Sequence, residues 1–235
     1  MRTIIFLLVL ISWEARTQNL IAEPNDYLKE IKEELKMEWP NNRTINLVFH
    51  GHSVPAGYFK TPIVNTLDAY PFQVLKKIKE HYPHAVINII NTSIGGENSV
   101  SGAERFEAEV LIHRPDVLFL DYALNDTGIG LERSKEAWRS MIGKALDQKI
   151  KVILLTPSPD QRIDIMETDN VLGQHQKQIR QLAMENGVGL VDSYTLFKEK
   201  AVAGDSISKY MSQVNHPNKE GHKLIADEIL TYFQQ

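Results

Sequence analysis

Ser53 has the residue type and the local sequence that a catalytic nucleophile requires. It lies in the segment Gly51–Gly57 (GHSVPAG), directly after an apolar run, where a tight glycine-flanked turn would expose a hydroxyl on a fixed backbone. Serine also stabilises ordinary turns, so this residue does not define a site by itself. The segment predicts nucleophilic chemistry only if a base lies nearby.

His216 is the best candidate for that base among the eight histidines. It precedes Pro217 in a loop, where an imidazole has no apolar surface to fill. His175 lies on the apolar face of a predicted helix, which favours a packed structural role. For His222, on the final predicted helix, we expect a role at the surface or at the helix end.

Gly96 and Asn125 are candidates for an oxyanion hole. A tetrahedral oxyanion needs donors aimed at it in advance, and a backbone N–H together with a side-chain amide provides them. Both residues also have structural interpretations. Gly95-Gly96 can form a turn with positive φ, and Asn125-Asp126 can cap the helix that follows.

The elements that must position these residues alternate along the chain. Five short apolar runs are separated by amphipathic segments, and this order predicts a parallel sheet covered by helices on both faces. The predicted strands are residues 45–50, 85–90, 117–122, 152–155 and 188–191. We therefore expect one three-layer α/β domain of the flavodoxin-like type, with its site at the carboxyl ends of the strands.

Helices are predicted where apolar residues recur at helical spacing. A leading helix is expected over residues 24–39, within a helical segment (18–44) that packs on the main domain (45–235). The next helix has Asn65 or Thr66 available as its cap, and Ser101 with Glu104 matches a capping box that opens another. Later helices are expected over residues 138–146, 172–183 and 225–233.

The composition is that of a soluble globular protein. The chain has 235 residues, of which 43% are hydrophobic and 24% charged, and its formal charge is −4. This mildly acidic balance argues against nucleic acid as a partner, because a phosphate backbone is bound by basic surfaces. The absence of cysteine excludes disulfides, thiolate metal sites and a cysteine nucleophile. No sequence feature indicates an oligomeric state.

Residues 1–17 are predicted to be an export signal. Arg2 is followed by the apolar run 4–11, which is too short to span a bilayer, since a span takes roughly 20 residues. Its length is typical of a signal-peptide core, and Ala15 and Thr17 predict cleavage before Gln18. A buried N-terminal strand is the alternative. We expect a secreted or periplasmic protein without a membrane span.

The candidate segments resemble, in order, the four sequence blocks of the SGNH hydrolases, also called the GDSL-type esterases. The resemblance extends from Ile45 to the end of the chain. It implies that Ser53 is the nucleophile and His216 the general base, with the N–H groups of Ser53 and Gly96 and the Asn125 amide as the oxyanion hole. The matching residues are Gly51, Ser53, Gly57, Gly96, Asn125, Asp126, His216 and Pro217.

The sequence departs from the family pattern at two positions of chemical importance. His52 replaces the aspartate before the serine, and Gln213 replaces the aspartate three residues before the histidine. The second aspartate would orient the imidazole and stabilise its charged form. Three interpretations stay open: a neutral acceptor such as a glutamine or a backbone carbonyl, a much weakened enzyme, or an acid from elsewhere. The candidate acids are Asp160, Asp192 and Asp205.

Two other functions stay open. His50 and His52 lie two residues apart on a predicted strand, so both imidazoles could face one side and bind zinc in a metal-dependent hydrolase, with His216 or Asp126. The other is a carbohydrate-binding relative that kept the fold without the activity.

The interpretation favoured by these patterns is a secreted serine esterase that works through an acyl-enzyme. Short acyl groups, above all acetyl, on carbohydrate are the expected substrates, because export places the protein among polysaccharides and the family often deacetylates them. Lipid esters and thioesters are alternatives within the family. The mechanism requires no cofactor and no metal.

Overall fold

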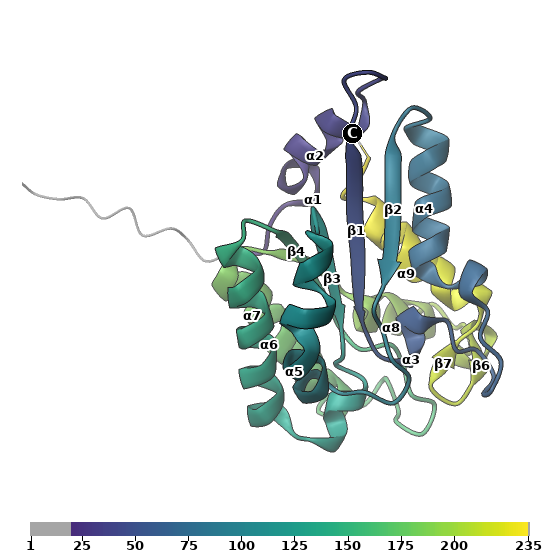
Figure 1. Cartoon of the computed structure of the whole chain (residues 1–235). Coiled ribbons are helices and arrows are strands. Elements are labelled where there is room, and N and C mark those ends of the chain that lie inside the picture. The colour runs from purple at the N-terminus through teal and green to yellow at the C-terminus, as the bar shows by residue number, and fades with distance from the viewer. Residues whose placement is uncertain (1–19, 235) are drawn as a thin grey trace, which may run out of the picture.

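Five parallel strands form the central sheet of the computed structural model, which describes residues 20–234. Their order is β2-β1-β3-β4-β5, so the strand order reverses at β1 and β3. The strands are β1 (Thr44–Gly51), β2 (Val86–Asn91), β3 (Val117–Asp121), β4 (Lys151–Leu155) and β5 (Gly189–Val191). A small antiparallel pair, β6 (Met211–Gln213) and β7 (His216–Pro217), lies near the carboxyl end of the sheet (Figure 1).

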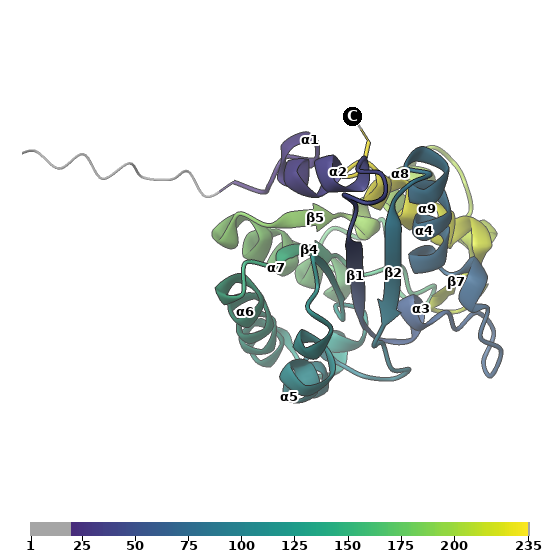
Figure 2. The same ribbon diagram turned by 45° about the horizontal axis from the view of Figure 1, so that its top comes forward.

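Helices cover both faces of this sheet, as Figures 1 and 2 show. On one face lie α5 (Ser99–Glu109), α6 (Leu131–Asp147) and α7 (Val171–Asn186). On the other lie α2 (Lys29–Leu35), α4 (Tyr70–His81), α8 (Ser193–Val202) and α9 (Lys219–Leu230). Two further short helices are α1 (Pro24–Tyr27), just before α2, and α3 (Ser53–Ala56), just after β1.

Side chains along each strand alternate between two cores. In β3, Val117 and Phe119 belong to the core shared with α4 and α9, whereas Leu118 and Leu120 belong to the core shared with α6. Successive side chains of a strand point to opposite faces, so a strand covered on both sides is apolar throughout. This is why the run over residues 117–122 indicated a buried parallel strand.

The parallel sheet between two helical layers confirms the predicted fold class, but several helix boundaries differ. The helix predicted over residues 24–39 is two short helices, because the backbone leaves the helical region at Leu28 (φ −102°, ψ 22°). The capping box predicted at Ser101 is wrong. Asn98 caps α5 instead, and its side-chain oxygen accepts the N–H groups of Val100 and Ser101.

Other differences arise from local turns. Neither Asn65 nor Thr66 caps α4, because a 3₁₀ turn over Thr66–Asp68 precedes it and α4 begins at Tyr70. Helix α8 was not predicted, since its sequence SYTLFKEKAV has little amphipathic periodicity.

The predicted export signal lies outside the described residues. Within residues 20–234, no helix has the length and apolar character needed to cross a membrane.

Asp126 fixes the loop that follows β3. Its fully buried carboxylate accepts hydrogen bonds from the Ser99 N–H (2.8 Å), the Ser134 hydroxyl (2.8 Å) and the Trp138 indole (2.7 Å). A buried carboxylate requires such partners, and here they come from α5 and α6. Asp126 therefore ties two helices to the end of β3 and holds the backbone beside Asn125.

Candidate active site

Ser53 and His216 meet at the carboxyl edge of the sheet. The Oγ of Ser53 lies 2.9 Å from the Nε2 of His216, although 163 residues separate them in the chain. Ser53 is the first residue of α3, and Gly57 ends that helix with a left-handed backbone (φ 92°) that favours glycine. His216 comes from β7, and both side chains are largely buried.

The second nitrogen of His216 faces a backbone carbonyl. Its Nδ1 lies 3.2 Å from the carbonyl oxygen of Phe59. That oxygen can only accept, so Nδ1 carries the proton and Nε2 is left to accept the hydrogen of the Ser53 hydroxyl. The geometry is that of a serine paired with a base in the tautomer required for proton removal.

No carboxylate proposed from the sequence supports His216. Each pairs with another side chain: Asp160 with Arg162, Asp192 with Arg180, and Asp205 with Lys209. Gln213 is bound to Thr61 and not to the imidazole. Among the three sequence interpretations, the geometry therefore favours the neutral acceptor. The sequence left its identity open, because any residue of a nearby loop can offer a main-chain carbonyl.

Gly96 and Asn125 line the same open groove as the serine–histidine pair. The groove has a volume of about 360 Å³ and is also lined by Tyr58, Thr61 and Asn215. Gly96 has a positive φ of 84°, and a side chain there would meet no atom within 4 Å, so the backbone conformation is what favours glycine.

Asn125 is held toward this groove by the residue after Gly96. Its Nδ2 donates one hydrogen bond to the Glu97 carbonyl (2.8 Å), and the same nitrogen carries a second N–H. The single Nε–H of Arg105 is in turn shared between the two oxygens of the Glu97 carboxylate, each 3.0 Å from Nε. The segment that carries the Gly96 N–H is thus fixed on two sides, which suits a preorganised oxyanion hole.

His50 and His52 make hydrogen bonds within the protein, whereas the metal-site interpretation required both imidazoles to face one cation. The Nδ1 of His50 lies 2.8 Å from Thr92 Oγ1, and burial, followed by the charge of Arg105, lowers the pKa of His50 to about 4. His52 accepts the Val54 N–H through Nδ1, which stabilises the start of α3. Across residues 20–234 there is no group of three or more His, Asp or Glu side chains placed to bind a metal ion.

His222 is fully buried, so a surface role is wrong; of the two roles expected from the sequence, it has the one near a helix end, in the first turn of α9. It lies on the face of α9 turned toward α4, where its Nδ1 accepts the Tyr70 N–H (3.2 Å). Its ring stacks on Phe59, with 4.9 Å between centroids and 12° between planes. Burial lowers the pKa of His222 to about 3, so the ring is neutral. It packs against Phe59, whose carbonyl faces His216.

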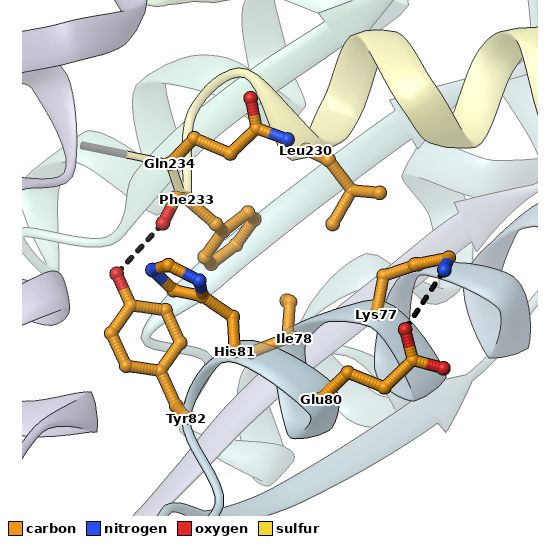
Figure 3. Close-up of a pocket in the computed structure, with 8 residues that line it drawn as sticks. All are labelled: Lys77, Ile78, Glu80, His81, Tyr82, Leu230, Phe233 and Gln234. Atoms are coloured by element: carbon orange, nitrogen blue, oxygen red, sulfur yellow. Dashed lines mark hydrogen bonds and ion pairs between the residues drawn. The ribbon is translucent and has the colours of Figure 1, made fainter.

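A second cavity, of about 270 Å³, lies at the other end of the molecule, between the ends of α4 and α9 (Figure 3). The Tyr82 hydroxyl donates to the Phe233 carbonyl on one side of it (2.7 Å), and Lys77 pairs with Glu80 on another (2.8 Å). None of the candidate catalytic residues lines it. The groove at Ser53 is therefore the candidate active site.

Comparison with known families agrees with this geometry. Residues 49–224 match the GDSL-like lipase/acylhydrolase family, a span that includes Ser53, Gly96, Asn125 and His216. This chain belongs to that family. It is therefore a hydrolase that acts on ester bonds. A comparison with curated proteins finds none that matches the sequence.

Solved structures with low sequence identity share the fold of this GDSL-like acylhydrolase. Axe2, an acetylxylan esterase from Geobacillus stearothermophilus, has a TM-score of 0.71 at 20% identity, covering 81% of this chain and 94% of its own. A two-domain esterase active on acetylated mannans has a TM-score of 0.70 at 22% identity, covering 89% of this chain and 54% of its own. A GDSL-like lipase from Parabacteroides merdae has a TM-score of 0.68 at 19% identity, covering 80% and 95%.

The electrostatics of the GDSL-like site favour a neutral imidazole. Burial lowers the pKa of His216 below its usual value of 6.5, the hydrogen bond to the Phe59 carbonyl partly offsets this, and the nearby His52 lowers it further. A carboxylate partner would have the opposite effect, since a negative charge stabilises the imidazolium. The base is thus free to accept a proton in mildly acidic solution.

We predict that the acidic limb of the pH dependence of kcat/KM has its midpoint below pH 6.5. The limb reports protonation of the free enzyme's base, and the pKa of His216 is lowered from that value. Hydrolysis of 4-nitrophenyl acetate across a pH series measures it. A midpoint above about pH 7, as expected for an imidazole beside a carboxylate, would contradict the site described above.

Proposed function

We propose that this GDSL-like acylhydrolase is a secreted serine esterase that removes short acyl groups, above all acetyl, from carbohydrate. The observation that carries the catalytic assignment is the 2.9 Å contact between Ser53 Oγ and His216 Nε2, with Gly96 and Asn125 lining the same groove. This contact pairs the nucleophile with a base, and a protein that only binds carbohydrate has no need of such a pair.

The proposed reaction has two halves. Ser53 Oγ attacks the ester carbonyl carbon and its proton passes to His216 Nε2, while the N–H groups of Ser53, Gly96 and Asn125 stabilise the oxyanion. The proton then passes to the departing sugar oxygen, which leaves an acyl-enzyme. Water attacks the acyl carbon, His216 takes its proton and returns one to Ser53 Oγ, and the carboxylic acid is released.

The groove favours a small acyl group on a polar alcohol. Its rim carries the phenol of Tyr58, the hydroxyl of Thr61 and the amides of Gln213 and Asn215, which are groups that bind sugar hydroxyls. It is open and not a deep apolar tunnel of the kind that a long acyl chain would fill. The acetylxylan esterase and the acetylmannan-active esterase of the same fold support this choice of substrate class.

A Ser53→Ala variant tests the catalytic assignment. We expect kcat for 4-nitrophenyl acetate and for acetylated xylo-oligosaccharides to fall at least about 10³-fold, because removal of a nucleophile leaves only binding and oxyanion stabilisation. Ser208→Ala, at an exposed serine outside the groove, is the matched control. A fluorophosphonate should label Ser53 in the wild type but not in a His216→Asn variant. Unchanged hydrolysis by Ser53→Ala would refute the assignment.

The secreted location rests on the sequence of residues 1–17 alone. If the proposal is correct, the full-length chain expressed in a bacterium is recovered outside the cytoplasm and its mature form begins at Gln18. N-terminal sequencing measures this. Recovery of the uncleaved chain from the cytoplasm only would contradict export.

A further inference from the structure

The carbonyl that faces His216 belongs to an exposed hairpin, not to the central sheet. The hairpin, residues 57–65, is closed by an antiparallel bridge between Tyr58 and Val64 and by a hydrogen bond from the Phe59 N–H to the Ile63 carbonyl (3.2 Å). These contacts are internal to the hairpin. They give it a shape, but they do not fix its position relative to β7.

Gln213 provides a contact between the hairpin and the strand pair β6–β7. Its side-chain oxygen accepts the Thr61 N–H (2.9 Å), and its side-chain nitrogen donates to the Thr61 hydroxyl (3.3 Å). Thr61 is two residues from Phe59, and Gln213 is paired with His216 across β6 and β7. One side chain therefore joins the strand pair that carries the base to the hairpin that carries its acceptor.

The inner side of the hairpin is held by packing. The Phe59 ring stacks on the buried ring of His222, which is itself bonded to the Tyr70 N–H. The Phe59 carbonyl therefore lies between a packed anchor on the inside and the Gln213–Thr61 pair on the outside. The base of the hairpin is also tied to the active site, since the Tyr58 N–H donates to the Ser53 carbonyl (3.0 Å) and the Tyr58 ring lies 6.2 Å from that of His216. The Gln213–Thr61 pair adds a contact nearer the exposed tip, two residues beyond Phe59.

We propose that Gln213 is a positioning residue, which through Thr61 keeps the Phe59 carbonyl in place to orient His216. The inference rests on the proposed function, since it concerns the same base. A side chain at the position of the family's aspartate thus serves the histidine indirectly. A glutamine side chain can hold Thr61 in this way because its amide has both an oxygen that accepts the Thr61 N–H and an N–H that donates to the Thr61 hydroxyl.

The first test is Gln213→Ala, assayed with 4-nitrophenyl acetate, which is too small to depend on the groove rim. We expect kcat to fall about 10- to 100-fold with KM nearly unchanged, because a small displacement of a catalytic group slows the chemical step. Gln161→Ala is the matched control, because the side chain of this exposed glutamine donates to the Gln213 main-chain carbonyl and makes no hydrogen bond to the hairpin, and its main-chain bond to Val214 is kept in the variant. Its kcat should equal that of the wild type.

The second test is Gln213→Glu, which can accept both the Thr61 N–H and the Thr61 hydroxyl. We expect its kcat to return to within about threefold of the wild type, and the acidic limb of its pH profile to move to higher pH, since a nearby negative charge stabilises the imidazolium. Thermal unfolding confirms that each variant is folded. Thr61→Val, which loses only the hydroxyl, should lower kcat less than Gln213→Ala, and adding it to Gln213→Ala should have no further effect.

A folded Gln213→Ala variant with wild-type kcat would overturn the inference, and so would a Glu variant that loses as much activity as Ala. Either result would leave the proposed function intact as long as Ser53→Ala is inactive. If Ser53→Ala is active, the proposed function itself fails. The two failures are therefore distinguishable.

Discussion

The hydrogen bond between His216 Nδ1 and the Phe59 carbonyl decides which ring nitrogen carries the proton, and the chemistry proposed for the site depends on that choice. In a serine protease, replacing the orienting aspartate by asparagine costs about 10⁴-fold in turnover because the tautomer is wrong. A carbonyl avoids that error, since it accepts only. A carbonyl carries no negative charge, so in the proposed reaction the imidazolium is less stabilised than in a triad. The imidazole correspondingly stays neutral to lower pH.

The fold serves this contact by bringing three chain segments to one edge of the sheet. β1 ends at the turn that carries Ser53, and β3 ends at the loop that carries Asn125, with the buried Asp126 fixing the latter. The β6–β7 pair presents His216 from the far end of the chain. Neighbouring parallel strands place their carboxyl ends together, so residues distant in sequence meet without any long connection.

The sheet, its layers and the meeting of Ser53 with His216 followed from the sequence, because buried parallel strands leave short continuous apolar runs, and functional side chains in this fold class lie at the carboxyl ends of the strands. Two kinds of feature did not. The Phe59 carbonyl is a main-chain group, and residue type does not reveal its position. The burial of His222 depends on how α9 packs against α4, and the Asn98 cap lies three residues before the expected one because several polar residues there compete for the role.

The tautomer of the His216 ring is the direct test of whether the Phe59 carbonyl prepares this imidazole to accept the proton of Ser53. Nitrogen-15 NMR of histidine side chains above neutral pH distinguishes the two tautomers, and a His216→Gln variant assigns the signal. The bond to the Phe59 carbonyl predicts a proton on Nδ1 and an unprotonated Nε2 that accepts from Ser53. A proton on Nε2 with a bare Nδ1 would contradict it, because that ring could neither donate to the Phe59 carbonyl nor take the serine proton.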